Sequence, residues 1–398
     1  MTNSSSSQSS TSSAGNDQRL LTREFLTVAA ATSLYFLGMG ASNPLLPEYV
    51  VDDLGGSEST AGLVVGVFAV SALVTRVGWG RLGGRRGARL LVVCGCVIAT
   101  VGMAILALTD SVAGAVVARL VLGTSQAALM TGSTVLAIEL APVARRGEAS
   151  SYILVAFHLG LGLGPVLGEA VHDATSYDAV WWMLGALSLA GAGVGLLLPH
   201  RPGDIGDDKP RWVHPKGVAP GLVAAFGVAA YASFSSFLPL YGETIGMDKV
   251  APVFMASSIS IAFARVVFGR LPDALGPVTA GTIALGLVVA GVLVAALWAS
   301  VPGVFVAAVI MAGGMALQTP SMMPVAVDGV SPAQRASAMA TFTMFMDLAV
   351  ALSSPAFGRV VEASSYRTAF LAMAAVSSLG LVLMYTVLAP SQRRTAAA

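Results

Sequence analysis

Among the ionisable residues inside long apolar segments of the sequence, where a charged side chain is costly, three are candidates for proton chemistry. They are Arg119, His158 and Asp347. A charge at the centre of a membrane helix costs about 2.5 to 3.5 kcal/mol, so such residues are usually retained for function. A carboxyl group and an imidazole can each take up and release a proton in such a setting. We therefore expect Asp347 and His158 to be candidates for proton carriage, and Arg119 to be a functional residue of the same region.

Structural alternatives stay open for the first two candidates. Asp347 can equally cap or hydrogen-bond a neighbouring helix, and His158 can be a satisfied contact residue between helices. The two cysteines, Cys94 and Cys96, lie in one apolar segment and predict neither a disulfide framework nor a metal site. We expect no metal, no cofactor and no catalytic residue.

The segments around these residues are too apolar for a soluble protein. Of the 398 residues, 55% are hydrophobic and 11% are charged, whereas soluble proteins carry about 25% charged residues. This excludes an ordinary soluble enzyme, a nucleic-acid-binding protein and a disordered chain. A membrane span needs roughly 20 apolar residues, and lipid favours a helix for each of them. Twelve segments fit, at about 25 to 46, 60 to 79, 89 to 109, 112 to 137, 151 to 171, 179 to 199, 218 to 241, 251 to 271, 278 to 299, 302 to 327, 337 to 360 and 366 to 388.

Polar stretches divide the chain into five parts. We expect a disordered serine-rich tail at 1–24, a six-helix bundle at 25–199, a linker at 200–217, a second six-helix bundle at 218–390 and a short tail at 391–398. The sequence thus predicts an all-α membrane protein of twelve transmembrane helices.

Arginine and lysine residues gather in alternate loops. Four arginines lie between the second and third segments, and four basic residues lie in the linker. Because loops rich in Lys and Arg stay in the cytoplasm, we expect both termini and the linker there, in a bacterial-type inner membrane. Trp181 and Trp182 begin the sixth segment on the opposite side, where we expect an interfacial aromatic anchor.

The two halves of the chain repeat each other. The run from Leu45 to Tyr49 resembles the run from Phe237 to Tyr241, with its proline displaced by 192 residues, and Arg76 precedes Arg265 by 189. Four further residues recur at an offset of 190: Pro142, Arg145, Pro165 and Gly168 match Pro332, Arg335, Pro355 and Gly358. A parallel duplication of this kind predicts two bundles related by a pseudo-twofold axis along the membrane normal.

The loop from Gly80 to Arg89 resembles the signature of the major facilitator superfamily between spans two and three. Gly80, Leu82, Arg85, Gly87 and Arg89 fit that signature, while Gly84 stands where the family has an aspartate. The copy after the eighth segment keeps Asp273 but has Ala274 in place of the basic residue. The resemblance covers about Leu26 to Leu388 and implies a transporter that works by alternating access.

A second element resembles a pattern of facilitator-type transporters in which an acid is followed, after six intervening residues, by an arginine. It occurs twice, as Glu139 with Arg146 and as Asp328 with Arg335. The resemblance implies a cytoplasmic latch of charge-assisted hydrogen bonds between the halves. For the loop arginines, ordinary positive-inside topology is the alternative. The predicted latch comprises Arg76, Arg85, Arg89, Glu139, Arg146, Arg265, Asp273, Asp328 and Arg335.

Two spans carry motifs of the exporters of this family. Gly160, Gly164, Pro165 and Gly168 resemble the antiporter motif, although close helix packing also explains them. The run from Arg119 to Gly123 resembles the fourth-span element whose arginine is implicated in proton coupling, with Leu122 in the glutamine place. The first span lacks the acid that many drug and proton antiporters have, so the proton site is expected elsewhere.

The substrate cavity of this family lies among spans one, four, seven and ten. Candidate residues on those spans are aromatic or neutral polar side chains, which suit a small amphipathic organic compound. Each aromatic can instead be a packing residue. The candidates are Tyr35, Asn43, Gln126, Tyr231, Phe234 and Gln318.

The sequence therefore favours a proton-coupled exporter driven by the proton gradient. An importer or an uncoupled facilitator of a small metabolite is the alternative. An enzyme is disfavoured because the metalloprotease and hydrolase motifs are absent from the sequence, and a sensor because the longest polar stretch between spans is the linker. We expect a small-molecule substrate and the lipid bilayer as partners, no nucleic acid, and a functional monomer.

Overall fold

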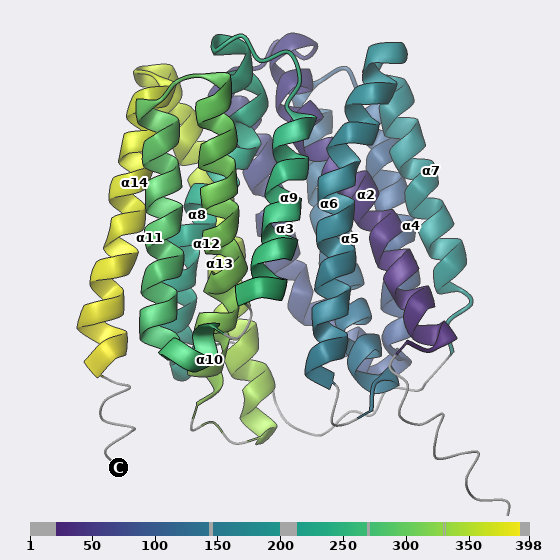
Figure 1. Cartoon of the computed structure of the whole chain (residues 1–398). Helices are drawn as coiled ribbons and strands as arrows, with labels where there is room; N and C mark the ends of the chain where they lie inside the picture. Colours follow the sequence, from purple (N-terminus) through teal and green to yellow (C-terminus); the bar gives the residue numbers. More distant parts are fainter. Residues whose placement is uncertain are drawn as a thin grey trace, which may run out of the picture.

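The computed structural model describes residues 21–142, 146–199, 213–268, 271–328, 330 and 332–390, and long helices dominate it (Figure 1). The first half holds α2 (Arg23–Asp52), α3 (Glu58–Arg86), α4 (Ala88–Ala107), α5 (Val112–Leu140), α6 (Arg146–Ala174) and α7 (Tyr177–Gly195). The second half holds α8 (Pro215–Thr244), α9 (Ala251–Phe268), α10 (Leu271–Leu275), α11 (Pro277–Leu297), α12 (Val301–Val327), α13 (Pro332–Ala363) and α14 (Tyr366–Leu383), which continues as the π-helical turn Met384–Leu388. The described residues contain no strand. The predicted all-α fold with six long helices in each half is confirmed, and the short α10 is an addition that the sequence did not predict.

Serine and threonine side chains fix where many helices begin. Thr22 accepts a hydrogen bond from the backbone N–H of Phe25 at 3.2 Å, and Ser57 accepts one from Thr60 at 3.3 Å. Such caps satisfy amide groups that the first helical turn leaves free. The same device starts four more helices through Ser111, Ser176, Ser300 and Ser365.

Glycines with positive φ mark equivalent turns in the two halves. Gly87 (φ 87°) and Gly276 (φ 78°) each precede a helix, and Gly55 (φ 63°) and Gly246 (φ 73°) lie in the connections α2–α3 and α8–α9. Residues with a side chain rarely adopt this conformation. The signature glycine Gly87 is thus required by the backbone, and the duplication seen in the sequence is present in the fold.

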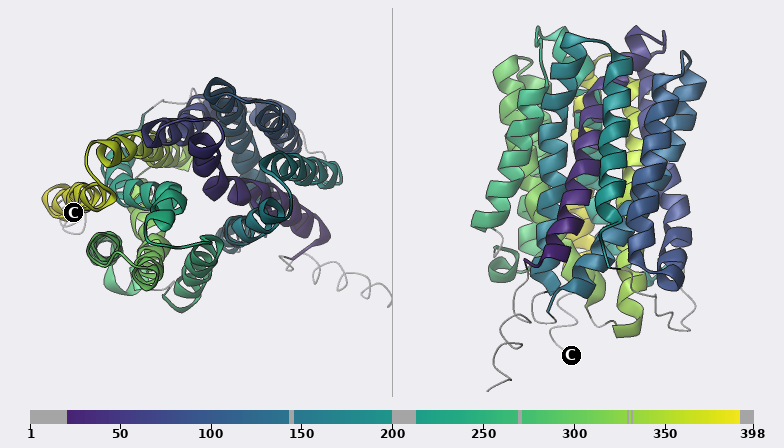
Figure 2. Two further views of the ribbon diagram at one scale, coloured as in Figure 1. Left: turned by 90° about the horizontal axis from the view of Figure 1, so that it is seen from above. Right: turned by 90° about the vertical axis from the view of Figure 1, so that its right-hand side faces the viewer.

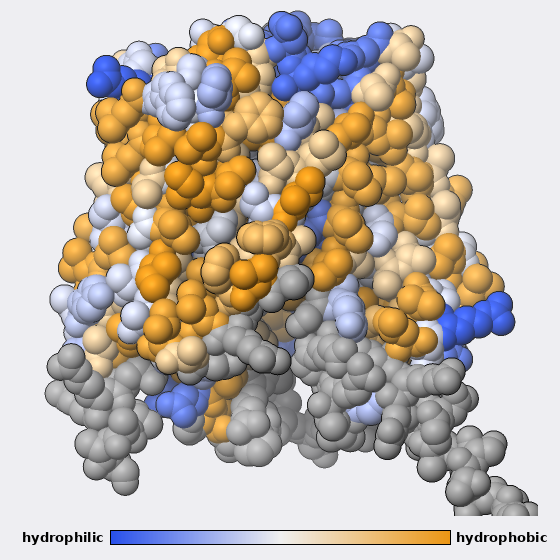
Figure 3. Space-filling model, viewed as in Figure 1, coloured by the Kyte–Doolittle hydropathy of each residue, from blue (hydrophilic) through white to orange (hydrophobic). Residues whose placement is uncertain are grey.

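Ten helices in the described part of the chain are long and apolar enough to cross a membrane. The apolar stretch of α9, Ala251–Arg265, is shorter, and α7 falls outside the ten. On the face shown in Figure 3, hydrophobic side chains cover the flank of the bundle, and a patch of hydrophilic side chains lies at the end that carries the α8–α9 connection. Following the predicted orientation, we call this the outer end and the opposite one the inner end.

One predicted anchor residue lies in the core instead of at the membrane surface. Trp181 is fully buried and its ring contacts Tyr49 and Tyr177, with centroids 5.6 and 6.2 Å away. The prediction of an interfacial anchor was wrong for Trp181, because its face of α7 packs against α2. Trp182 is half exposed, as an anchor requires.

Each half has its own hydrophobic core. Buried side chains of α2 to α7 form one cluster, and those of the second half form two larger clusters and a small one. The halves meet mainly where α3 packs along α13 and where α6 packs along α9. Figure 2 shows the two groups of helices side by side when the molecule is seen from above. The bounds predicted for the two bundles, 25–199 and 218–390, stay a prediction, and most of the predicted linker lies outside the described residues.

Glycines let the two halves approach closely at these interfaces. A Cβ atom on Gly66 would lie 2.7 Å from the carbonyl oxygen of Ala351, and one on Gly62 would lie 2.6 Å from that of Ser354. At the other interface, a Cβ on Gly162 would lie 2.5 Å from Cβ of Ser258. Small residues of this kind permit tight helix contact in membranes.

Candidate functional site

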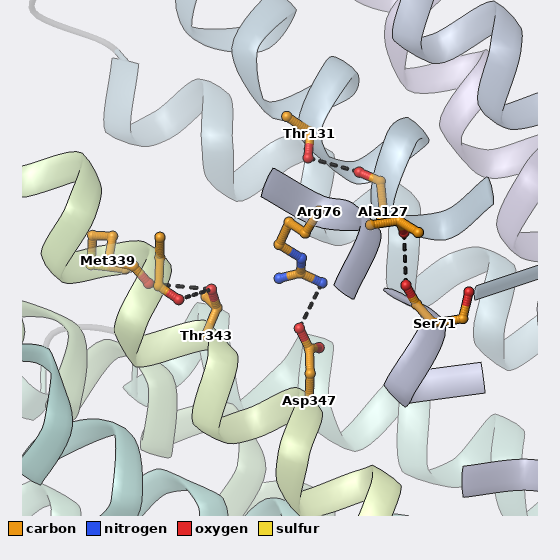
Figure 4. A network of polar contacts seen from close by, with 9 residues as sticks. Ser71, Arg76, Ala127, Thr131, Met339, Thr343 and Asp347 are labelled. Atoms are coloured by element: carbon orange, nitrogen blue, oxygen red, sulfur yellow. Dashed lines mark hydrogen bonds and ion pairs between the residues drawn. The ribbon is translucent and has the colours of Figure 1, made fainter. Parts of the chain in front are cut away.

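An ion pair joins the two halves inside the helical bundle. Nη2 of Arg76 on α3 lies 2.9 Å from Oδ2 of Asp347 on α13 (Figure 4). The sequence predicted Arg76 in a cytoplasmic latch and Asp347 in a proton pathway, and the structure brings them together. Both side chains keep partial solvent access, with 27% and 21% of their surfaces exposed.

The pair lies inward of the close contact between Gly66 on α3 and Ala351 on α13. Asp347 is one helical turn from Ala351, whose carbonyl faces Gly66, and Arg76 extends from α3 to meet it. Oδ2 of Asp347 and Nε of Arg76 have no hydrogen-bond partner among the described residues. The contact is therefore an ion pair without an aligned hydrogen bond, and the carboxylate keeps room to accept a proton.

Hydroxyl groups near the pair are already engaged. Thr343 donates to the carbonyls of Met339 and Ala340 at 3.2 and 3.1 Å, and Thr131 donates to Ala127 at 2.7 Å (Figure 4). These are bonds within single helices. The described hydroxyls of this network therefore form no relay to Asp347, and a proton would have to reach it through solvent.

Arg119 lies apart from this interface, inside the first half. Only 2% of the residue is exposed, and its guanidinium lies 4.3 Å from the ring centre of Phe68, a cation–π contact. Its Nε and Nη1 atoms have no hydrogen-bond partner among the described residues. Nearby, the Tyr35 hydroxyl and Ser125 Oγ are 2.8 Å apart. The structure does not bring Arg119 to Asp347, so its role in proton coupling stays a prediction.

His158 lies at the other interface, between α6 and α9. Its Nδ1 donates a hydrogen bond to the carbonyl oxygen of Leu154 at 2.6 Å, which fixes the hydrogen on that nitrogen in the neutral ring. Arg265, which the sequence predicted to belong to the latch, lies on the facing helix α9.

The cytoplasmic latch stays a prediction. Arg89 donates from Nη2 to the carbonyl oxygen of Leu196 at 2.6 Å, which caps the end of α7 within the same half. Arg85, Glu139 and Asp328 are exposed. The side chains of Arg146, Asp273 and Arg335 lie outside the described residues.

Polar contacts that the sequence did not predict tie the halves at the outer end. Oε1 of Glu169 on α6 accepts hydrogen bonds from the backbone N–H groups of Val250 and Ala251, at 3.1 and 2.6 Å. These amides begin α9, so a carboxylate from the first half caps a helix of the second. The sequence shows Glu169 as an acid near the end of an apolar segment. Its partners could not be predicted, because they are backbone amides and every residue except proline has one.

Further outer contacts run beside this cap. Lys249 pairs with Asp173, whose carboxylate raises the pKa of the lysine. At the α3–α13 interface, Glu362 accepts from the backbone N–H of Ser59 at 2.9 Å, and the Tyr366 hydroxyl donates to Glu58 at 2.5 Å. The halves are thus fastened along both interfaces at this end.

A cavity of about 460 Å³ opens between the halves at the outer end. Its lining includes six acidic side chains and one lysine, so its walls carry excess negative charge. Groups of acids, histidines and cysteines arranged to hold a metal ion are absent from the described residues. The acids that line it are Glu48, Asp52, Glu169, Asp173, Glu243 and Asp248.

The glycines of the antiporter-like motif serve helix packing. A Cβ on Gly160 would lie 2.6 Å from the backbone of Phe36, and one on Gly164 would lie 2.5 Å from that of Ala41. Gly168 faces the side chain of Ala41, and Pro165 lies inside α6. These residues pack α6 against α2 within the first half, which is the structural alternative left open above; their connection with export stays a prediction.

The substrate candidates fall into two groups. Tyr35 and Phe234 are buried in the bundles, and Gln318 donates from Nε2 to the carbonyl of Ala224 at 2.9 Å. Gly227, which the sequence analysis missed, makes room for this amide, because a Cβ there would lie 2.2 Å from Gln318 Oε1. The less buried candidates are Asn43, Gln126 and Tyr231.

Comparison with known proteins gives a consistent family. A family model described as Major Facilitator Superfamily matches residues 28–302 and 253–398. The chain is 26% identical over 367 residues to YhhS of Escherichia coli (strain K12), named an uncharacterized MFS-type transporter, covering 88% of this chain and 89% of that protein. Among solved structures, it resembles the nucleoside transporter NupG, with a TM-score of 0.77, 15% identity and coverage of 91% and 99% of the two chains. It also resembles a bacterial homologue of the human lysosomal transporter Spinster in an inward-facing conformation, with a TM-score of 0.75, 14% identity and coverage of 91% and 95%.

Proposed function

Because the chain belongs to the major facilitator superfamily, we propose that it exports a small amphipathic organic compound in exchange for protons. It is an integral, multi-pass membrane protein and a transporter of that family. The observation that carries the proton coupling is the ion pair between Arg76 and Asp347, which joins the two halves inside the bundle.

The proposed switch is the proton on Asp347. When the halves are arranged as here, Arg76 stabilises the ionised carboxylate and thus favours loss of its proton. When the halves rotate and the pair separates, a carboxylate without a counter-charge in an apolar setting takes up a proton. A proton gained from the outer side and released on the inner side drives export by this cycle.

The polar contacts at the outer end would close that end of the transporter during part of the cycle. In the arrangement described, Glu169, Glu58 and Glu362 hold the outer ends together through charge-assisted hydrogen bonds. Such bonds are directional and break when the halves rock apart. This arrangement resembles the inward-facing state of the alternating-access cycle, in which the substrate is loaded from the cytoplasm.

The setting follows from the charge distribution of the loops. We infer that both termini and the linker face the cytoplasm of a bacterial cell and that the protein lies in the inner membrane. The proton gradient is the proposed energy source, and the substrate and the surrounding lipid are the proposed partners of a monomer that needs no cofactor.

Proton movement in proteoliposomes tests this function. Purified protein is reconstituted with a pH-sensitive dye inside the vesicles, and amphipathic compounds are added on one side under an imposed pH gradient. The wild-type protein should move protons when a substrate is present, and Asp347→Asn should lose this movement while still exchanging labelled for unlabelled substrate.

Two outcomes would contradict the proposal. Substrate that equilibrates without proton movement in the wild-type protein would indicate an uncoupled facilitator. Unchanged proton-driven transport by Asp347→Asn would reject Asp347 as the proton carrier.

A further inference from the structure

The duplication places two arginines at equivalent positions of the two interfaces. Arg76 on α3 and Arg265 on α9 are 189 residues apart, the offset that also relates their neighbouring motifs. Asp347 faces Arg76. One repeat earlier, at an offset of 190, the position of Asp347 is occupied by Phe157, which is followed by His158. The second interface therefore has the arginine without the acid.

Helix geometry places Arg265 and His158 on the facing sides of α9 and α6. Gly162 and Ser258 form a close contact between these helices. Arg265 lies seven residues, close to two turns, further along α9, and His158 lies four residues, about one turn, back along α6. Because the two helices run in opposite directions, both steps lead toward the inner end.

The charge of Arg265 is uncompensated at this interface. Its Nε atom is buried and has no hydrogen-bond partner among the described residues. No acid on α6 lies within nine residues of His158: Glu148 is ten residues away and Glu169 is eleven, about 15 and 16 Å along the helix. Arg265 is the only residue with an acidic or basic side chain on α9. A cation that is partly removed from water without a partner favours binding of an anion.

We propose that Arg265 binds the anionic group of the substrate, so that the transported compounds are amphipathic monoanions such as carboxylates. This inference rests on the proposed transport function and adds the charge of its substrate. The substrate's carboxylate would hold, against Arg265, the place that the Asp347 carboxylate holds against Arg76. The guanidinium presents a planar set of donors that matches two carboxylate oxygens.

Equilibrium binding to the purified full-length protein tests the substrate class. Three probes of one shape are compared, namely naphthaleneacetate, its neutral methyl ester and the cationic naphthylethylamine. The wild-type protein should bind naphthaleneacetate most tightly. Arg265→Gln should weaken that binding about tenfold, because a hydrogen bond to a charged group is lost, and should leave binding of the ester unchanged.

Two further variants separate recognition from damage to the fold. Arg265→Lys keeps the charge and should retain part of the preference, and Arg367→Gln removes an exposed arginine at the outer end and should change nothing. The proposal is overturned if the wild-type protein binds none of the probes or prefers the ester or the amine, or if Arg265→Gln weakens the acid and the ester equally. Because binding is measured without a gradient, its result is independent of proton coupling: Asp347→Asn should keep the preference even though it loses proton movement.

Discussion

The α3–α13 and α6–α9 interfaces are built from the same parts but differ in charge. Each has a close contact through a glycine, at Gly66 and at Gly162, and each carries an arginine further toward the inner end. At α3–α13 the arginine meets Asp347 at 2.9 Å, whereas at α6–α9 the opposing helix offers the neutral ring of His158. The glycine contacts are thus shared by the two interfaces, whereas the residue opposite the arginine differs, so the two interfaces can have different functions.

In the two proposals above, this difference gives the α3–α13 interface the proton and the α6–α9 interface the anionic ligand. A carboxylate that faces an arginine responds to protonation, because neutralising it removes the attraction. An arginine that faces an uncharged residue has its attraction available for an anion from outside the protein. If both arginines were paired with an acid of the protein, neither of the two described interfaces would have an arginine available for an anion.

The largest expected effect comes from breaking the packing that both interfaces share. Gly66→Leu places a side chain where a Cβ atom already lies 2.7 Å from the Ala351 carbonyl, a backbone atom that cannot swing away. We expect transport in proteoliposomes to fall more than tenfold, since the halves can no longer approach. Gly78→Leu in the same helix is the control, because a Cβ there meets nothing within 4 Å. Equal transport by the two variants would show that this contact is dispensable.

An intermediate effect is expected when the two interfaces are made alike. His158→Asp places a carboxylate opposite Arg265 and creates a second ion pair between the halves. The new carboxylate competes with an anionic ligand, so affinity for naphthaleneacetate should fall about tenfold, the same loss that is expected of Arg265→Gln. His158→Asn, which adds no charge, is the matched control. If His158→Asp leaves the affinity unchanged, Arg265 is not the residue that the anion meets.

The smallest effects are expected at the outer end. Glu169→Ala removes the cap of α9 and should shift the equilibrium away from the outer-closed arrangement by about fivefold, equivalent to roughly 1 kcal/mol. Spin labels on the α2–α3 and α8–α9 connections would measure this as a longer distance. Glu169→Gln keeps an acceptor oxygen and should lie between Ala and wild type; a distance distribution that Glu169→Ala does not change would assign the closure to other contacts.

Lys249→Gln should shift the same distribution less than Glu169→Ala, because the pair with Asp173 is exposed and screened. The pKa of Lys249 is raised by Asp173, so the contribution of the pair is present at neutral pH and disappears as the pH rises through that raised value. Raising the pH should therefore shift the distance distribution of the wild-type protein in the same direction as Lys249→Gln does. If the distribution of the Lys249→Gln variant shifts with pH as much as that of the wild type, another group is responsible.

Much of the architecture was predictable because membrane helices are set by local sequence. The apolar segments predicted the helices, and the offset of the repeat predicted two bundles, before any contact was known. The inward place of Trp181 was not predictable, because two adjacent tryptophans at the start of an apolar helix look alike until the rotation of the helix is fixed. The capping contact of Glu169 was not predictable either, because its partners are backbone amides, which residue types do not identify.

By itself, the sequence determined which charges lie inside the membrane and which family of folds carries them. Hydrophobicity and the need to satisfy backbone hydrogen bonds in lipid leave helices as the solution for such segments, and these are local properties of the chain. Only the tertiary structure decided that Arg76 meets Asp347 while Arg265 lies on the helix that packs against the helix of His158. Those encounters depend on how far each helix is rotated and how closely glycines let it approach, and both are set by contacts between segments distant in sequence.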